Sequence, residues 1–296
     1  MTRPIHLVSF APVNDCPSSA EAGRRAAEER ELRVRIHAAE NVPTVIYLPG
    51  LHGDWTLNAG FRRAIGQRAQ LIEVTYPRTL TWSLDDYAAG IETALAERGI
   101  ATGWLLGESF GSQVVWSLLA RGRFQTQGVI FAGGFGEYPV KWGVRLVRWL
   151  IRRLPLGVMT RFAAFYSAVA RWRFRQVPDS ADSIREFVER RTELDRQAMV
   201  HRLQLIAAHD PSATASQLQL PVFLLSGLVD PVVPWPLTRR WFRRHCPSLR
   251  GFRVISLADH NVLNTAPAAS ARAVLGWIQS CRRDTNGGTQ IHSRHH

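Results

Sequence analysis

Short, uninterrupted apolar runs recur along this chain and alternate with segments of helical pattern. Thr44–Leu48 is such a run, and the turn-forming pair Pro49-Gly50 ends it. Continuous apolar runs of this length are typical of parallel strands that helices cover on both faces. Similar runs occur at residues 103–106, 128–132 and 222–225, and at residues 70–75 and 252–255, where Glu73 and Arg253 are the charged exceptions. The alternation predicts an α/β fold, with a mostly parallel sheet between two layers of helices.

Local signals mark where several of these elements begin. Leu32–Ile36 alternates apolar and polar residues, which is typical of a half-exposed edge strand. Ser83, followed by Asp85 and Asp86, predicts the N-terminus of a helix, because a serine oxygen caps free N–H groups and acids favour the first turn. A last helix is expected over about residues 266–278.

One interval breaks the alternation. Residues 137–210 contain no strand-like run, only helical pattern interrupted by Pro155 and Pro178. A single crossover helix needs far fewer residues, so the excess predicts an inserted helical cap. The core is therefore assigned to residues 32–136 and 211–281. Residues 1–31 form a polar arm of unassigned structure, and residues 282–296 are polar and expected to be disordered.

The segment Gly107-Glu108-Ser109-Phe110-Gly111 matches the pattern G-x-S-x-G. It follows an apolar run and leads into a helical stretch, which is the context that gives this pattern its meaning. A serine on such a turn stands exposed as a nucleophile, and nearby backbone N–H groups at the helix start can stabilise negative charge. We therefore interpret Ser109 as a candidate nucleophile.

A serine nucleophile needs a base, and the base needs an acid that orients it. His260 directly follows the last apolar run, where loops at the carboxyl ends of strands collect catalytic groups. Asp230 follows the preceding run, in a turn-rich loop, and is the preferred acid. Asp259 is the rival, although adjacent side chains rarely point at each other, so a supporting role behind the reacting groups is expected for it.

The loop after the first central run supplies a fourth element. Its glycines allow backbone N–H groups to approach a substrate oxygen closely. The N–H groups of Leu51 and Phe110 are the two predicted donors of an oxyanion hole. His52 and Glu108 are candidates for supporting roles next to these groups.

These motifs resemble those of the α/β-hydrolase superfamily, particularly its capped, esterase-like members with a serine nucleophile. The resemblance covers about residues 34–278 and rests on four loops, around Pro49, Ser109, Asp230 and His260, in the expected order. It implies an eight-stranded, mostly parallel sheet with a helical lid after the sixth strand. The chain departs from many members by having Pro-Gly where they have His-Gly, and by its N-terminal arm.

The resemblance implies a serine hydrolase that cleaves an ester or a related acyl compound through an acyl-enzyme. Epoxide hydrolases and haloalkane dehalogenases of this fold have an aspartate at the position that corresponds to Ser109, so the serine disfavours both functions. Thioester, amide or carbon–carbon bond cleavage by the same residues remains open, as does a non-catalytic ligand-binding role. The expected partner is a small acyl substrate with an apolar acyl group, and neither a metal nor another cofactor is expected.

The net charge of +13 raises the question of an anionic partner. Lys141 is the only lysine among 37 basic residues, and such a bias toward arginine resembles a coding habit more than a binding adaptation. No nucleic-acid-binding motif accompanies the charge, so no nucleic acid is expected. The three cysteines follow no disulfide or zinc spacing, and neither a signal peptide nor a membrane span is visible, so a cytoplasmic location is expected.

The predicted cap concentrates basic charge. Nine basic residues and no acidic one lie between Val140 and Arg175. Lys141, Arg145, Arg148 and Arg152 share one helical face, and aromatic residues are frequent nearby. Such a helix could contact an anionic membrane. Alternatively, it is a lid whose apolar face covers the pocket and whose arginines face water, and the arginine bias of the whole chain favours this second reading.

Overall fold

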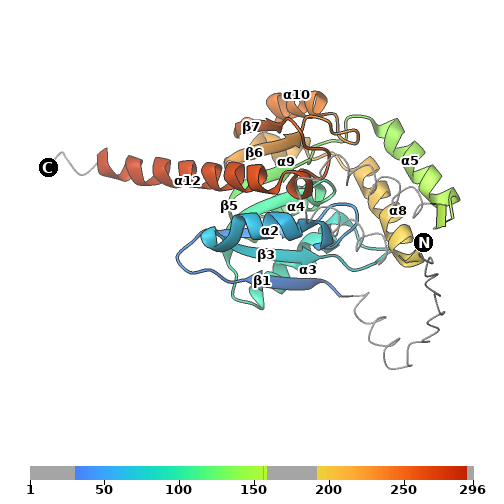
Figure 1. Ribbon diagram of the computed structural model, residues 1–296, viewed down its shortest axis with the longest axis horizontal. Helices are drawn as coiled ribbons and strands as arrows, with labels where there is room; N and C mark the ends of the chain where they lie inside the picture. The colour runs from blue at the N-terminus through green and yellow to red at the C-terminus, as the bar shows by residue number, and fades with distance from the viewer. Residues whose placement is uncertain (1–30, 156, 159–191, 292–296) are drawn as a thin grey trace, which may run out of the picture.

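A seven-stranded sheet forms the centre of the computed structural model, which describes residues 31–155, 157–158 and 192–291 (Figure 1). The strand order is β1-β3-β2-β4-β5-β6-β7, and every pairing is parallel except that of β1 with β3. The mostly parallel sheet predicted from the apolar runs is thereby confirmed. The strands are β1 (Arg33–His37), β2 (Thr44–Leu48), β3 (Gln70–Thr75), β4 (Thr102–Glu108), β5 (Gln125–Ala132), β6 (Val222–Gly227) and β7 (Leu249–Ile255).

The eighth strand implied by the resemblance is not confirmed. The described residues form seven strands, and β1, the first of them, is the antiparallel edge strand expected from its alternating pattern. Residues 1–30, where the predicted arm falls, lie outside the described residues.

Side chains of the central strands alternate between two separate cores, because successive residues of a strand point to opposite faces. On β2, Ile46 and Leu48 lie in one core, while Val45 and Tyr47 lie in the other. Helices α3, α4 and α10 contribute to the first core, and α2, α11 and α12 to the second. The helices are α2 (Ala59–Ile65), α3 (Leu84–Ala96), α4 (Gly111–Arg121), α5 (Lys141–Arg153), α8 (Glu193–Ala208), α9 (Ser212–Gln217), α10 (Trp235–His245), α11 (Val262–Thr265) and α12 (Pro267–Ile291), with short 3-10 turns at Thr56–Asn58 and Gly66–Arg68.

Helix α3 begins where the sequence predicted. The Ser83 hydroxyl accepts a hydrogen bond from the Asp86 N–H, and the Asp86 carboxylate accepts one from the Ser83 N–H at 2.8 Å. This reciprocal capping box satisfies two backbone donors that the first helical turn leaves without partners.

The last helix extends beyond its predicted end and into residues 282–291 of the predicted tail. Helix α12 begins near the predicted start but continues to Ile291, well beyond the predicted end (Figure 1). Ala271, Val274 and Ile278 are fully buried in the second core. Their packing offsets the unfavourable free energy of helix nucleation. Once a helix exists, each further residue adds one backbone hydrogen bond at small cost, so the helix extends through a polar segment.

Two long helices, α5 and α8, lie in the interval between β5 and β6 and pack against each other (Figure 1). Val144 is the buried contact of α5, while Trp142 and Trp149 on the same helix are 71% and 53% exposed. Val147 and Leu150 are also exposed, at 44% and 39%. Contact between α5 and an anionic membrane stays a prediction. The basic and aromatic residues from 159 to 175 lie outside the described residues.

Candidate active site

Ser109 lies in the turn between β4 and α4 with a φ angle of +50°. This left-handed value is uncommon for a residue with a side chain and is characteristic of strained functional turns. Strand and helix approach closely at the turn. A Cβ on Gly107 would lie 2.9 Å from Val115 Cγ2, and one on Gly111 would lie 2.2 Å from the Leu48 carbonyl oxygen. Glycines on both sides therefore allow this turn, which puts Ser109 at the carboxyl edge of the sheet.

Replacing Gly111 by alanine is expected to lower the free energy of unfolding by about 1–3 kcal/mol, because backbone must move to admit the methyl group. Urea denaturation measures this change. The matched control is Gly276→Ala on the exposed side of α12, where an added Cβ meets nothing within 4 Å. That substitution is expected to raise the free energy of unfolding by up to about 1 kcal/mol. Equal effects of the two substitutions would contradict the tight packing at Gly111.

His260 lies in the loop between β7 and α11, and its ring meets the serine. The distance from His260 Nε2 to Ser109 Oγ is 2.8 Å. The loop between β5 and α5 packs against the backbone of His260. A Cβ on Gly133, which has a φ angle of +55°, would lie 2.6 Å from the His260 carbonyl oxygen. The imidazole is 12% exposed, so it is held by protein on most sides but remains accessible.

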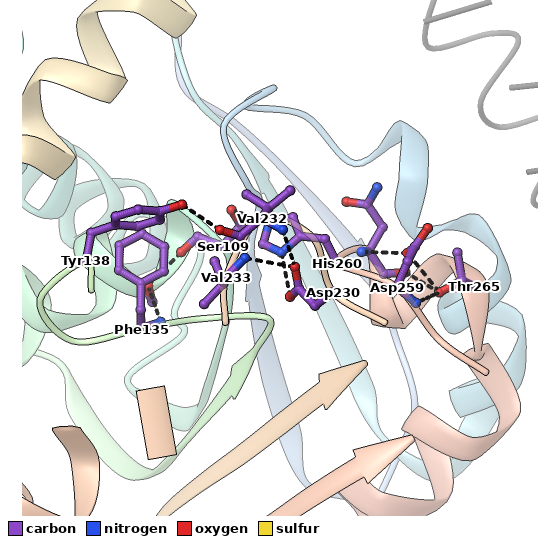
Figure 2. Close-up of polar contacts among 11 residues, drawn as sticks. Ser109, Phe135, Tyr138, Asp230, Val232, Val233, Asp259, His260 and Thr265 are labelled. Carbon is purple, nitrogen blue, oxygen red and sulfur yellow. Dashed lines mark hydrogen bonds and ion pairs between the residues drawn. The ribbon is translucent and has the colours of Figure 1, made fainter. Parts of the chain in front are cut away.

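Asp230 lies in the loop between β6 and α10 and meets the other nitrogen of the same ring. Its Oδ2 is 2.9 Å from His260 Nδ1, and the carboxylate is 1% exposed. Its Oδ1 accepts hydrogen bonds of 2.8 Å from the N–H groups of both Val232 and Val233 (Figure 2). The loop backbone thus fixes the carboxylate in an orientation that directs its second oxygen at the imidazole.

Asp259, the rival acid, is turned toward other partners. Its Oδ1 accepts from the Asn261 N–H at 2.9 Å and from the Thr265 hydroxyl at 3.2 Å. Figure 2 shows this carboxylate directed at Thr265 and not at the ring of His260. The structure therefore brings Asp230, and not Asp259, against the imidazole.

The acids around His260 affect its pKa. Burial disfavours the charged imidazolium, but the hydrogen bond and charge of Asp230, with the charges of Glu108 and Asp259, outweigh that effect. As a result, the pKa of His260 is raised above its ordinary value of 6.5. A base with such a pKa is well matched to accept a proton near neutral pH.

The predicted oxyanion donors lie in two neighbouring turns. Gly50, next to Leu51, lies so close to Ser109 that a Cβ on Gly50 would be 3.3 Å from Ser109 Cβ and 3.4 Å from His52 Nδ1. Among the described residues, no acceptor takes the N–H of Leu51 or that of Phe110. Both donors therefore remain available beside Ser109.

Comparison with solved structures relates this arrangement to known proteins. A thermophilic esterase from Thermogutta terrifontis superposes with a TM-score of 0.67 at 17% identity, over 84% of this chain and 93% of that chain. The enol-lactonase from Burkholderia xenovorans gives 0.66 at 16% identity, over 84% and 96%. An esterase from Exiguobacterium antarcticum gives 0.68 at 12% identity, over 84% and 95%. No protein-family model and no curated protein sequence matches the chain.

The chain has the α/β-hydrolase fold. The resemblance noted in its four loops is thereby confirmed at the level of fold. At sequence identities of 12–17%, the similarity establishes the fold alone. In this fold, the turn that carries Ser109 follows β4, and the interval holding α5 and α8 follows β5.

Glu108, which directly precedes Ser109, is buried. Its Oε2 accepts a hydrogen bond from the Tyr47 hydroxyl, whereas its buried Oε1 has no hydrogen-bond partner. Burial raises the pKa of Glu108 to about 7, although the Tyr47 hydrogen bond and the charge of His260 oppose the rise. Glu108 therefore changes its charge near neutral pH, within electrostatic reach of the imidazole.

Sequence reasoning missed Arg202, which lies on α8 and is 1% exposed. Its Nη1 donates to the Leu51 carbonyl at 2.9 Å, so it contacts the loop of the predicted oxyanion hole. No signal in the sequence pointed to it, because arginines are frequent in this chain and usually face water.

Within the described ranges, no cluster of histidine, cysteine, aspartate and glutamate could hold a metal ion, and Cys246 and Cys281 are free thiols. Over the same ranges, no helix has the length and apolar character needed to cross a membrane.

Proposed function

We propose that this protein is a serine hydrolase that cleaves esters with an apolar acyl group through a covalent acyl-enzyme. The observation that carries the proposal is the continuous hydrogen-bonded path from Ser109 Oγ through both nitrogens of His260 to Asp230. A serine with a base at 2.8 Å, and a base oriented by a buried carboxylate, meets the geometric requirements of nucleophilic catalysis.

In the first half of the reaction, Ser109 Oγ attacks the ester carbonyl carbon while His260 Nε2 takes the hydroxyl proton. The carbonyl oxygen becomes negatively charged and accepts hydrogen bonds from the N–H groups of Leu51 and Phe110. Asp230 accepts the Nδ1–H hydrogen bond and stabilises the imidazolium. The imidazolium then gives its proton to the leaving alcohol, and the acyl group stays on Ser109.

In the second half, a water molecule attacks the acyl-enzyme while His260 again takes a proton. The same two N–H groups stabilise the second tetrahedral intermediate. Its collapse returns the proton to Ser109 Oγ and releases the carboxylic acid. Side chains, backbone and water supply every proton and bond in this cycle, so the proposal requires no cofactor.

Ester hydrolysis is preferred over thioester, amide and carbon–carbon bond cleavage because structural neighbours of this fold include esterases and an enol-lactonase. Esters and enol lactones share an acyl–oxygen bond. The small acyl substrate and the cytoplasmic location stay predictions.

The test combines turnover with active-site labelling. Purified protein is assayed with p-nitrophenyl acetate, butyrate and octanoate, and is incubated with a fluorophosphonate probe followed by peptide mass spectrometry. We expect turnover of at least one ester and a single adduct on Ser109. Folded protein that neither turns over esters nor takes up the probe would overturn the proposal and favour the non-catalytic, ligand-binding alternative.

Replacing Glu108 by glutamine is expected to move the acid limb of the pH profile of kcat/KM to lower pH, by up to about one unit. The reaction needs neutral His260, and the negative charge of Glu108 raises the His260 pKa. Because the pKa of Glu108 is itself about 7, Glu108 is partly anionic over the pH range in which His260 titrates. Removing that charge lowers the pKa of His260, so the neutral base persists at lower pH. Glutamine can still accept the Tyr47 hydrogen bond.

The measurement is kcat/KM for one ester between pH 5 and pH 9. The matched control is Glu97→Gln, which removes the same charge from an exposed side chain just after α3. Its profile is expected to coincide with that of the wild type. An unchanged or upward-shifted acid limb in the Glu108 variant would contradict the electrostatic link to His260.

A further inference from the structure

We propose that Arg202, on helix α8, is a positioning residue that holds the oxyanion loop in its reactive geometry. This inference rests on the proposed hydrolase function, because it assigns Arg202 a role through the N–H of Leu51. The guanidinium of Arg202 is buried and lies outside the hydrogen-bonded path of Ser109, His260 and Asp230.

Arg202 joins two loops that follow neighbouring strands. Its Nη1 donates to the carbonyl of Leu51 at 2.9 Å, and its Nη2 donates to the carbonyl of Pro77 at 3.1 Å. These loops follow β2 and β3, which are parallel neighbours in the sheet. The Leu51 N–H lies in the adjoining peptide plane, together with the Gly50 carbonyl, which accepts a hydrogen bond from the Gly53 N–H. Holding the Leu51 carbonyl therefore fixes the second of two linked peptide planes and restricts the direction of the Leu51 N–H.

The loop is shaped around the guanidinium. Gly53 has a φ angle of +83°, and a Cβ on it would lie 2.4 Å from Arg202 Nη1. The Gly53 N–H in turn donates to the Gly50 carbonyl at 3.0 Å, which closes the turn that contains Leu51. The turn therefore folds directly against the arginine, with no space for a side chain between them.

Arg202 is also linked to the turn of Phe110, the second predicted oxyanion donor, because both residues pack against the ring of Tyr76. Its guanidinium carbon lies 5.5 Å from the centre of the Tyr76 ring, which meets the Phe110 ring edge-on at 5.8 Å between centres. Tyr76 and Phe110 are both buried. One arginine thus contacts Leu51 directly and packs toward Phe110 through a single intervening ring.

Arg202 is charged although it is almost fully buried, which is unusual for an arginine. No carboxylate of the described residues forms an ion pair with it, and its polar contacts are two carbonyls and, at 3.5 Å, the Tyr87 hydroxyl. A buried charge without a counter-charge destabilises a fold, and an apolar side chain of similar size would fill the space at lower cost. A positive charge beside the oxyanion loop, however, favours the negative transition state, and dipoles fixed before the reaction do so most effectively.

The test replaces Arg202 by methionine, which is unbranched and of similar length. We expect kcat for ester hydrolysis to fall by about 30-fold, less than the hundred- to thousand-fold typical of removing an oxyanion donor. KM is expected to stay within about twofold, because the loss concerns the transition state more than the bound ester. The second-order rate of fluorophosphonate labelling at Ser109 should fall in parallel, and Arg202→Lys should retain more kcat than the methionine variant.

The matched control is His201→Ala. His201 is the preceding residue on α8, and its Nε2 meets the Trp82 carbonyl at 2.8 Å, so it ties the same helix to the core without touching Leu51. Its kcat is expected to match the wild type, even if its melting temperature falls. A methionine variant with wild-type kcat, or with a loss no greater than that of His201→Ala, overturns the inference. Inactivity of the wild type itself would instead count against the proposed function.

Discussion

Replacing Ser109 by alanine is expected to lower kcat for ester hydrolysis by about a million-fold, the loss typical of removing the nucleophile of a serine hydrolase. The Oγ atom that forms the acyl-enzyme is lost, and His260 Nε2 loses its partner at 2.8 Å. The remaining hydrogen-bond donors can still polarise a carbonyl, so a small residual rate above that in water is expected. Stopped assays over hours measure this residual rate.

The fold should tolerate this change, because alanine differs from serine by one atom and Ser109 Oγ contacts the imidazole and not the backbone of the turn. The control is Ser216→Ala, whose hydroxyl donates locally to the Ala213 carbonyl on α9. Both variants should melt near the wild-type temperature, and only the Ser109 variant should lose labelling by the fluorophosphonate. Undiminished turnover by Ser109→Ala would overturn the assignment of the nucleophile.

Replacing Asp230 by asparagine is expected to lower kcat by about ten-thousand-fold, through the tautomer of His260. Asparagine can keep its oxygen on the Val232 and Val233 N–H groups, which places its NH₂ group where Oδ2 now meets His260 Nδ1. The NH₂ group then donates to Nδ1 and drives the ring proton to Nε2. In that tautomer Nε2 cannot accept the proton of Ser109.

The matched control uses the neighbouring acid. Asp259→Asn removes the same charge one residue from His260, but the Asp259 carboxylate is directed at Asn261 and Thr265. Its oxygen can keep both hydrogen bonds, so kcat is expected to fall by less than about tenfold, mainly through the lost charge near the imidazole. If the two variants lose similar activity, or Asp259→Asn loses more, the choice of Asp230 is wrong.

The sheet was predictable because its signal is local and repeated. Each central strand is buried on both faces, so Thr44–Leu48 and its counterparts had to be continuous apolar runs. Each of the seven described strands coincides with one of these runs or with the alternating segment before them, whereas the eighth strand was an expectation carried by resemblance alone. The end of α12 was missed because a helix anchored by Val274 and Ile278 continues into residues that have no apolar pattern of their own.

The positions of Ser109, His260 and Asp230 were predictable for a topological reason. Each follows an apolar run, and parallel strands bring their carboxyl ends to one edge of the sheet, so residues 151 and 30 positions apart in the chain meet there. The choice between Asp230 and Asp259 depended on side-chain direction. Neither composition nor chain order reports that direction.

The sequence by itself determined the sheet, the turn that carries Ser109 and the loops that carry His260 and Asp230, since apolar runs, glycines and chain order are local or one-dimensional properties. The tertiary structure decided which carboxylate meets the ring of His260, how deeply Glu108 is buried, and that Arg202 donates to the Leu51 carbonyl. These three features depend on contacts between segments far apart in the chain. The environment of each side chain exists only after the strands and helices have packed, and no local pattern encodes it.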